Sequence, residues 1–205
     1  MGLANFLTLT RVLLSPFFLI IYVHYSFLGL SQESMPYALL ILLVLLELSD
    51  AFDGYYARRY GEVSDLGKIL DPMADSVARI SMFLAFTYPP IDIPVLFVFL
   101  IIWRDSIVST LRTICALRGV ALAARKSGKI KSVAQAATAI FIVLLMLLQS
   151  RGTIALSQLQ TISFWIALAA VSFTLLTAVD YISSNRVHIK KILSFKRRKQ
   201  KNLKT

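Results

Sequence analysis

The chain has 205 residues, of which 57% are hydrophobic, and its net charge is +11. Long apolar runs at this hydrophobic share exclude an ordinary soluble protein and favour an all-α integral membrane protein. The single cysteine, Cys115, excludes an internal disulfide and a cysteine-based metal site. The basic residues gather beside the apolar runs and in the tail. This placement is typical of a membrane protein with a cytoplasmic face, and we expect no nucleic-acid partner.

Six apolar runs predict six transmembrane helices, because each can cross about 30 Å of hydrocarbon at 1.5 Å per residue. A mildly amphipathic opening at residues 1–10 predicts an N-terminal interfacial helix before the first span. We expect the spans at about residues 12–30, 37–59, 69–88, 93–117, 132–149 and 161–183. Residues 1–185 are then a single transmembrane catalytic domain, and residues 186–205 are a basic cytoplasmic tail that contacts membrane lipids.

The charges of the connecting loops predict the orientation. Eight basic residues lie in, or at the edge of, the loops that join spans two and three and spans four and five: Arg58, Arg59, Lys68, Arg118, Arg125, Lys126, Lys129 and Lys131. The loops on the other side carry only Arg151. By the positive-inside rule, the first set of loops and both termini face the cytoplasm of a multi-pass protein in the cell membrane.

Four aspartates, Asp50, Asp53, Asp71 and Asp75, lie where the second and third predicted helices meet. The first two are three residues apart and the last two are four apart, so each pair projects from one helix face. A short polar loop lets the helices return antiparallel, which brings the four carboxylates together. Oxygen ligands in that number suit a hard divalent cation, Mg²⁺ or Mn²⁺, in one or two copies.

Such a metal site is suited to phosphoryl transfer. Two divalent ions about 4 Å apart can clamp a pyrophosphate and position an attacking hydroxyl, while a carboxylate that is not fully committed to metal accepts the hydroxyl proton. Gly54 and Ala57 are small enough to let a flat ligand approach the helix closely. Arg58 can neutralise phosphate charge through two hydrogen bonds.

The segment as a whole fits the pattern D-x2-D-G-x2-A-R-x8-G-x3-D-x3-D without a mismatch, and it therefore resembles the CDP-alcohol phosphotransferase family. The matching positions are Asp50, Asp53, Gly54, Ala57, Arg58, Gly67, Asp71 and Asp75. The resemblance implies the six-helix membrane fold, two divalent ions, and attack of an alcohol on the lipid-linked phosphate of a CDP-activated donor, with release of CMP. It implies that all four aspartates bind metal and that Asp75 is also the general base. It assigns the CDP donor to five residues: Asp53, Gly54, Ala57, Arg58 and Gly67.

Three further segments, NFLTLTRVLLSPF, IIWRDSIVSTLR and GKIKSVAQ, resemble the bacterial phosphatidylglycerophosphate synthase branch of this family. Asp105 and Ser132 stand where that branch usually has Glu and Thr. The implied donor is CDP-diacylglycerol, the implied acceptor is sn-glycerol 3-phosphate, and a homodimer is expected by resemblance alone. A basic pocket for the acceptor's phosphate is predicted from Arg104, Arg112, Lys129 and Lys131.

Two alternatives stay open. The acceptor can instead be inositol phosphate or a similar sugar phosphate, because a basic pocket recognises phosphate before it recognises the polyol. The second alternative is a divalent-cation transporter, which would place acids at mid-membrane depth in several helices, whereas these aspartates gather at one edge.

Beside the motif, we expect Arg79 to orient Asp75 and Glu47 to support the site from outside. Asp105 forms either a local ion pair with Arg104 or a functional contact.

Overall fold

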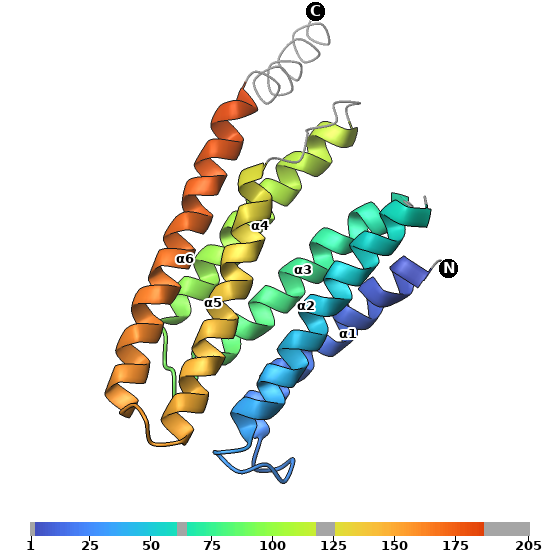
Figure 1. The fold of residues 1–205 in the computed structure, drawn as a ribbon. Helices are drawn as coiled ribbons and strands as arrows, with labels where there is room; N and C mark the ends of the chain where they lie inside the picture. The colour runs from blue at the N-terminus through green and yellow to red at the C-terminus, as the bar shows by residue number, and fades with distance from the viewer. Residues whose placement is uncertain (1–2, 61–64, 118–125, 187–205) are drawn as a thin grey trace, which may run out of the picture.

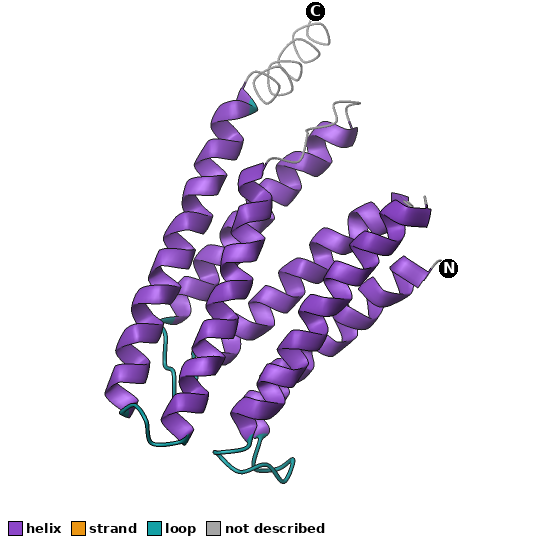
Figure 2. Cartoon of the chain, in the orientation of Figure 1, coloured by secondary structure: helices purple, strands orange, loops and turns teal. Residues whose placement is uncertain are grey.

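The structure is a computed structural model that describes residues 3–60, 65–117 and 126–186. All regular structure in these ranges is helical (Figure 2). The elements are α1 (Leu3–His24), α2 (Met35–Tyr60), α3 (Asp65–Ala85), α4 (Val95–Leu117), α5 (Lys126–Ser150) and α6 (Leu156–Ser184). The all-helical prediction is confirmed for this part of the chain.

The helices alternate in direction and form two groups of three (Figure 1). α1 packs against α2 and α3, whereas α6 packs against α4 and α5. Contacts of α2 with α5 and of α3 with α4 join the groups. The C-terminal end of α2, the start of α3 and the start of α5 consequently lie at the same end of the molecule (Figure 1). The aspartate segment and the basic segment, which are far apart in the sequence, therefore share one end of the fold.

An apolar core fills the other end of the molecule. The ring of Phe86, in the turn directly after α3, meets those of Phe18 and Tyr22 in α1 edge to face, with centroids 5.8 and 6.2 Å apart, an arrangement that aromatic pairs favour. The hydroxyl of Tyr22 donates to the carbonyl of Tyr88 at 3.0 Å, so the buried phenol keeps a hydrogen-bond partner. This packing fixes α1 against α3 and sets the positions of the polar residues further along both helices.

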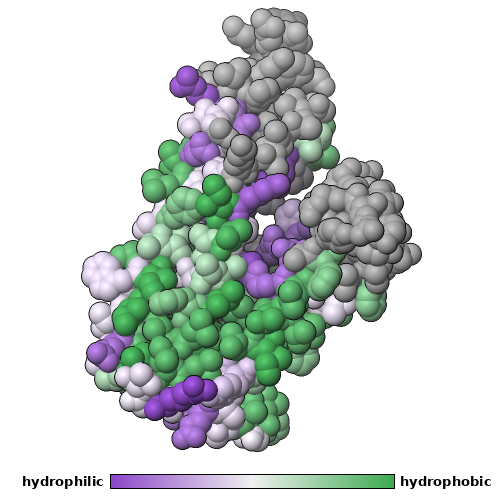
Figure 3. All heavy atoms as spheres, in the orientation of Figure 1, coloured by the Kyte–Doolittle hydropathy of each residue, from purple (hydrophilic) through white to green (hydrophobic). Residues whose placement is uncertain are grey.

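Two segments among the described residues are long and apolar enough to cross a membrane: Ser127–Ser150 and Leu156–Ser184. A shorter apolar stretch covers Thr8–His24. Much of the outer surface of the helices is also hydrophobic (Figure 3). These observations agree with a membrane protein.

Several of the predicted boundaries are wrong. α1 ends at His24 rather than at residue 30, and residues 25–29 form turns. The separate interfacial helix at residues 1–10 is not seen, because α1 runs unbroken from Leu3 to His24. No glycine or proline interrupts residues 3–11, so the helix continues without a break into the apolar stretch. α5 begins at Lys126 rather than at residue 132. Its first turn is tied to α6 by a 2.8 Å hydrogen bond from Ser127 to Asp180.

Candidate active site

The described motif aspartates receive hydrogen bonds from α1. Thr8 donates to Asp71 at 2.9 Å. Nη1 of Arg11 donates to Oδ1 of Asp50 at 2.5 Å and to Oδ1 of Asp75 at 2.8 Å. Because one nitrogen reaches both carboxylates, the facing sides of α2 and α3 hold Asp50 and Asp75 close together, as the spacing predicted for antiparallel helices.

The remaining motif positions lie in the same two helices. Asp53, Gly54, Ala57 and Arg58 belong to α2, and Gly67 belongs to α3. The orientations of their side chains fall outside the described part of the structure. Their assignment to metal and to the CDP donor therefore stays a prediction from the sequence.

The donor set of this region fits a hard divalent cation. Asp50, Asp71 and Asp75 offer carboxylate oxygens at the polar end of the fold, and the side chains of Asp50 and Asp75 are 47% and 34% exposed. Carboxylates with solvent access are the ligands that Mg²⁺ and Mn²⁺ prefer. No three acidic, histidine or cysteine side chains among the described residues form a ready-made ion cage. Completing a cage requires a further ligand, for which the sequence offers Asp53.

A cavity of about 700 Å³ opens beside the aspartates and is lined by residues of α3, α4, α5 and α6. Hydrophilic residues gather within the opening between the two helix groups (Figure 3). Asp71 and Asp75 line the cavity together with all four predicted acceptor residues, namely Arg104, Arg112, Lys129 and Lys131. The structure thus brings two motif aspartates and the predicted basic pocket into a single space.

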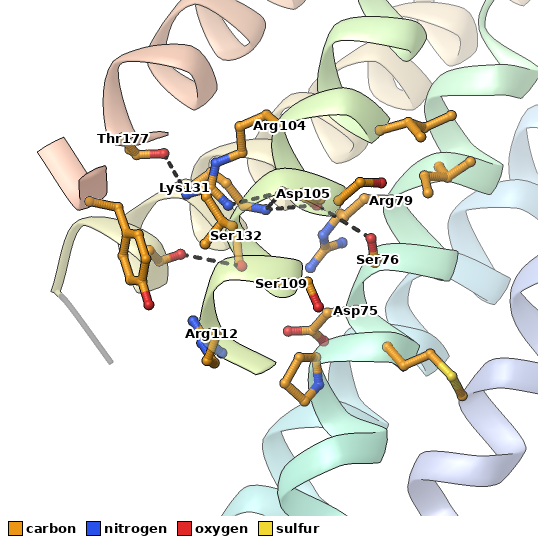
Figure 4. Close-up of a pocket in the computed structure, with 18 of the residues that line it drawn as sticks. Asp75, Ser76, Arg79, Arg104, Asp105, Ser109, Arg112, Lys131, Ser132 and Thr177 are labelled. Carbon is orange, nitrogen blue, oxygen red and sulfur yellow. Dashed lines mark hydrogen bonds and ion pairs between the residues drawn. The ribbon is translucent and has the colours of Figure 1, made fainter. Parts of the chain in front are cut away.

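The four basic residues differ in their surroundings. Arg104 and Lys131 are buried, with 6% and 8% of their surface exposed. Both donate to Asp105, with Lys131 Nζ 2.8 and 3.1 Å from its two oxygens and Arg104 Nη1 at 2.9 Å (Figure 4). Arg112 and Lys129 are exposed residues of the cavity wall. The ion pair between Arg104 and Asp105, one of two readings from the sequence, is confirmed.

Asp105 also links the basic pocket to the aspartate segment. Ser76, the neighbour of Asp75 in α3, donates to Asp105 at 3.3 Å (Figure 4). From α6, Thr177 accepts a 2.9 Å hydrogen bond from Nη2 of Arg104. The polar wall of the cavity is therefore one network that spans α3, α4, α5 and α6.

Arg79 does not bond Asp75 in the way expected from the sequence. Its Nη1 and Nη2 instead contact the two carboxylate oxygens of Glu47 in α2, the second pair at 3.3 Å. Glu47 precedes Asp50 by one turn and Arg79 follows Asp75 by one turn, so antiparallel packing places them opposite each other. Glu47 therefore supports the site by pairing α2 with α3.

Thr8 and Arg11 are site residues that the sequence reasoning missed. The sequence does point to Arg11, because burying a charged residue inside an apolar run costs free energy unless it has a partner of opposite charge. Its two partners are 39 and 64 residues away, and spacing within one helix does not reveal such contacts.

Comparison with known proteins identifies the class to which this fold and site belong. The CDP-alcohol phosphatidyltransferase family model matches residues 1–182. The chain therefore belongs to this family, and the resemblance found in the sequence is confirmed.

Individual relatives match over most of both chains. A CDP-diacylglycerol–glycerol-3-phosphate 3-phosphatidyltransferase of Bacillus subtilis is 34% identical over 194 residues, covering 90% of this chain and 95% of the relative. The Rickettsia typhi protein of the same name is 30% identical and covers 91% and 98%. A probable phosphatidylglycerophosphate synthase of Mycobacterium tuberculosis is 29% identical and covers 89% and 80%.

Proposed function

We propose that this protein transfers the phosphatidyl group of CDP-diacylglycerol to sn-glycerol 3-phosphate, giving phosphatidylglycerol phosphate and CMP. The observation that carries the proposal is the cavity that unites Asp71 and Asp75 with the four basic residues. A metal-assisted transfer between a nucleotide-linked lipid and a small phosphorylated alcohol needs both kinds of residue in one place. The names of the Bacillus and Rickettsia relatives support the same donor and acceptor.

In the proposed reaction, a hydroxyl oxygen of the acceptor attacks the phosphorus that carries the diacylglycerol. The bond from that phosphorus to the CMP oxygen breaks, and CMP leaves with the bonding electrons. The carboxylate of Asp75 accepts the hydroxyl proton, which makes the attacking oxygen a better nucleophile. Asp75 lines the same cavity as the basic pocket, which supports its assignment as the base that acts on an acceptor bound there.

Asp50, Asp53, Asp71 and Asp75 are the proposed metal ligands. Two Mg²⁺ or Mn²⁺ ions held there would neutralise the diphosphate and favour the departure of CMP. The family is generally dependent on divalent metal, which supports this choice of cofactor. Thr8 and Arg11 fix the orientation of the three described carboxylates through the α1 hydrogen bonds.

The CDP group of the donor is assigned to the end of α2 and the start of α3. Gly54, Ala57 and Gly67 leave room for the cytidine to approach the helices, and Arg58 pairs with the diphosphate. Asp53 is shared between donor and metal. These five roles rest on the sequence pattern and on family membership.

The acceptor's phosphate is assigned to the basic residues of the cavity. Arg112 and Lys129 are exposed residues of its wall and are the proposed direct contacts. Arg104 and Lys131 are already bonded to Asp105, so they add positive potential and shape the pocket. A phosphate bound there lies in the same cavity as Asp75, which directs the acceptor's hydroxyls toward the aspartates.

The proposed setting is the cytoplasmic membrane, which all six helices span. The basic segments at the site end predict that the active site and both termini face the cytoplasm, where the water-soluble acceptor is available. The donor would enter from the surrounding lipid. Formation of a homodimer is also part of this proposal and rests on resemblance.

Purified protein in lipid nanodiscs, supplied with labelled CDP-diacylglycerol and a panel of acceptors, tests the function. We expect CMP release and phosphatidylglycerol phosphate with glycerol 3-phosphate. Asp50→Asn should abolish both products, whereas Glu33→Gln at the opposite end serves as the matched control. CMP release with inositol phosphate and none with glycerol 3-phosphate would overturn the assignment of glycerol 3-phosphate as the acceptor. Metal uptake into proteoliposomes without any CMP release would overturn the reaction class.

A further inference from the structure

The α1 helix places two buried polar residues, one turn apart, against the proposed metal ligands. Thr8 and Arg11 are only 1% and 2% exposed. Thr8 bonds Asp71, and Arg11 bonds both Asp50 and Asp75. All three described aspartates are therefore held from the same side by α1. The two contacts differ in one decisive respect, because the threonine is neutral and the arginine carries a full positive charge.

A divalent ion held by Asp50 and Asp75 would be close to the Arg11 guanidinium, because Nη1 is 2.5 and 2.8 Å from oxygens of the same two carboxylates. A unit charge and a double charge at such short range repel strongly even in a partly solvated site. Arg11 also neutralises part of the carboxylate charge that attracts the ion. Both effects lower metal affinity and oppose the gain from orienting the ligands, which is worth about 10- to 100-fold in such sites.

We propose that Arg11 makes metal binding depend on the nucleotide donor. The arginine holds the affinity for divalent metal alone low, and the negative diphosphate of the donor restores the charge balance when it arrives. Metal and donor then bind cooperatively, each raising the affinity of the other by the same factor. This inference rests on the proposed function, in particular on the aspartates as metal ligands.

The charged groups near Arg11 support this balance. Arg79 is paired with Glu47 across α2 and α3, so that neighbouring pair contributes no net charge. Lys131 and Arg104 share the single carboxylate of Asp105, which leaves a net positive charge on the acceptor side. Arg11 thus lowers the net negative charge of the aspartate cluster, which weakens its attraction for a lone divalent ion and its repulsion of a diphosphate.

Titration of the full-length protein in nanodiscs with Mn²⁺, followed by electron paramagnetic resonance, tests the proposal. The titration is made with and without cytidine 5′-diphosphate as the diphosphate probe. For the wild type, we expect the nucleotide to tighten Mn²⁺ binding by about tenfold or more. Arg11→Gln should bind Mn²⁺ alone about tenfold more tightly than the wild type and lose most of the nucleotide effect. Arg11→Lys keeps the charge and should behave like the wild type.

Thr8→Val is the matched variant for orientation without charge. It removes the hydrogen bond to Asp71 and should weaken Mn²⁺ binding about tenfold, the opposite of Arg11→Gln. Weaker Mn²⁺ binding by Arg11→Gln would overturn the proposal and make Arg11 an orienting residue. An equal nucleotide effect in wild type and Arg11→Gln would overturn it as well.

Thermal unfolding in the same nanodiscs shows whether each variant is correctly folded. Without Arg11, Asp50 and Asp75 repel each other, so Arg11→Gln should melt at lower temperature in chelator and recover when Mn²⁺ is added. A lower melting temperature that Mn²⁺ does not restore counts against the proposal. If the wild type shows no Mn²⁺ binding with or without the nucleotide, the metal site of the proposed function itself fails, which distinguishes the two failures.

Discussion

Glu47 in α2 and Arg79 in α3 form a two-point ion pair one helical turn from Asp50 and Asp75, at the border between the polar site and the apolar core. The Arg79 side chain is 7% exposed and the Glu47 side chain is 27% exposed. The pair fixes α2 against α3 at the level where the motif carboxylates must face each other. Its position makes it a support for the site rather than a ligand.

Replacing Glu47 by leucine should therefore destabilise the protein. The change leaves the buried Arg79 guanidinium without its carboxylate. We expect the free energy of unfolding to fall by about 2 to 3 kcal/mol, which is less than breaking a fully buried pair costs because Glu47 is partly exposed. Chemical or thermal unfolding in nanodiscs measures the change. The double variant Glu47→Leu with Arg79→Met removes both charges and should recover most of the stability. Equal stability of Glu47→Leu and the wild type would show that the pair does not hold the helices together.

Asp75→Asn should abolish transfer while Mn²⁺ and CDP-lipid binding largely persist. The asparagine cannot accept a proton at neutral pH, and loss of a general base lowers turnover about 10²- to 10⁴-fold. Turnover and Mn²⁺ affinity measured on the same preparation separate the two roles. Asp92→Asn, the same change at the opposite end of the fold, is the control. If Mn²⁺ affinity collapses together with turnover, Asp75 is principally a ligand and the base is another group.

Arg112→Gln and Lys129→Gln should each raise the KM for glycerol 3-phosphate and leave the KM for CDP-diacylglycerol unchanged. Each change removes a charge-assisted hydrogen bond to the acceptor's phosphate, worth about 1.5 to 3 kcal/mol, so we expect a 10- to 100-fold rise. Steady-state kinetics with each substrate varied in turn measures the effect. Arg151→Gln is the matched control, because Arg151 is exposed and bonds the Tyr37 hydroxyl at the other end of the fold. A rise in both KM values would instead show that these residues attract both substrates through their charge and do not contact the acceptor specifically.

Asp105→Asn should impair the acceptor pocket and the stability of the protein together. The change leaves Lys131 and Arg104 buried with less negative charge, and we expect a cost of about 2 kcal/mol in unfolding free energy. The KM for glycerol 3-phosphate should rise as Lys131 shifts. Asp105→Glu keeps the charge and restores the residue usual in related sequences, so it should retain activity in the same assays. Full activity and stability of Asp105→Asn would show that the network is dispensable.

Much of the site was predictable because it is encoded within single helices. The spacing of Asp50 and Asp53 and of Asp71 and Asp75 needs only helical periodicity to be interpreted. The alternating direction of successive helices predicts that the aspartate segment and the basic segment lie at the same end of the fold. Lys129 and Lys131, which the sequence places in a basic pocket, line the cavity as part of α5 rather than as part of a loop.

The contacts between helices were not predictable in the same way. Arg11 bonds two aspartates on different helices, and helical periodicity gives no information about which faces of separate helices meet. The same limit applies to Arg79: helical spacing predicts a contact with its neighbour Asp75, whereas Arg79 pairs with Glu47 of α2. The glycine and basic residues before residue 132 predict a loop, but they form the first turn of α5. A hydrogen bond from Ser127 to Asp180 of α6 stabilises this turn.

Cysteine labelling tests the proposed orientation in the membrane. Thr153 and Ser184 are exposed residues at opposite ends of the α5–α6 hairpin. A helix of 29 residues such as α6 is about 44 Å long at 1.5 Å per residue, which exceeds the hydrocarbon thickness. In intact cells, a membrane-impermeant maleimide should label Thr153→Cys and spare Ser184→Cys, and both should react after the membrane is permeabilised. The native Cys115 is buried and serves as the background. Labelling of Ser184→Cys from outside would reverse the orientation and place the acceptor pocket away from the cytoplasm.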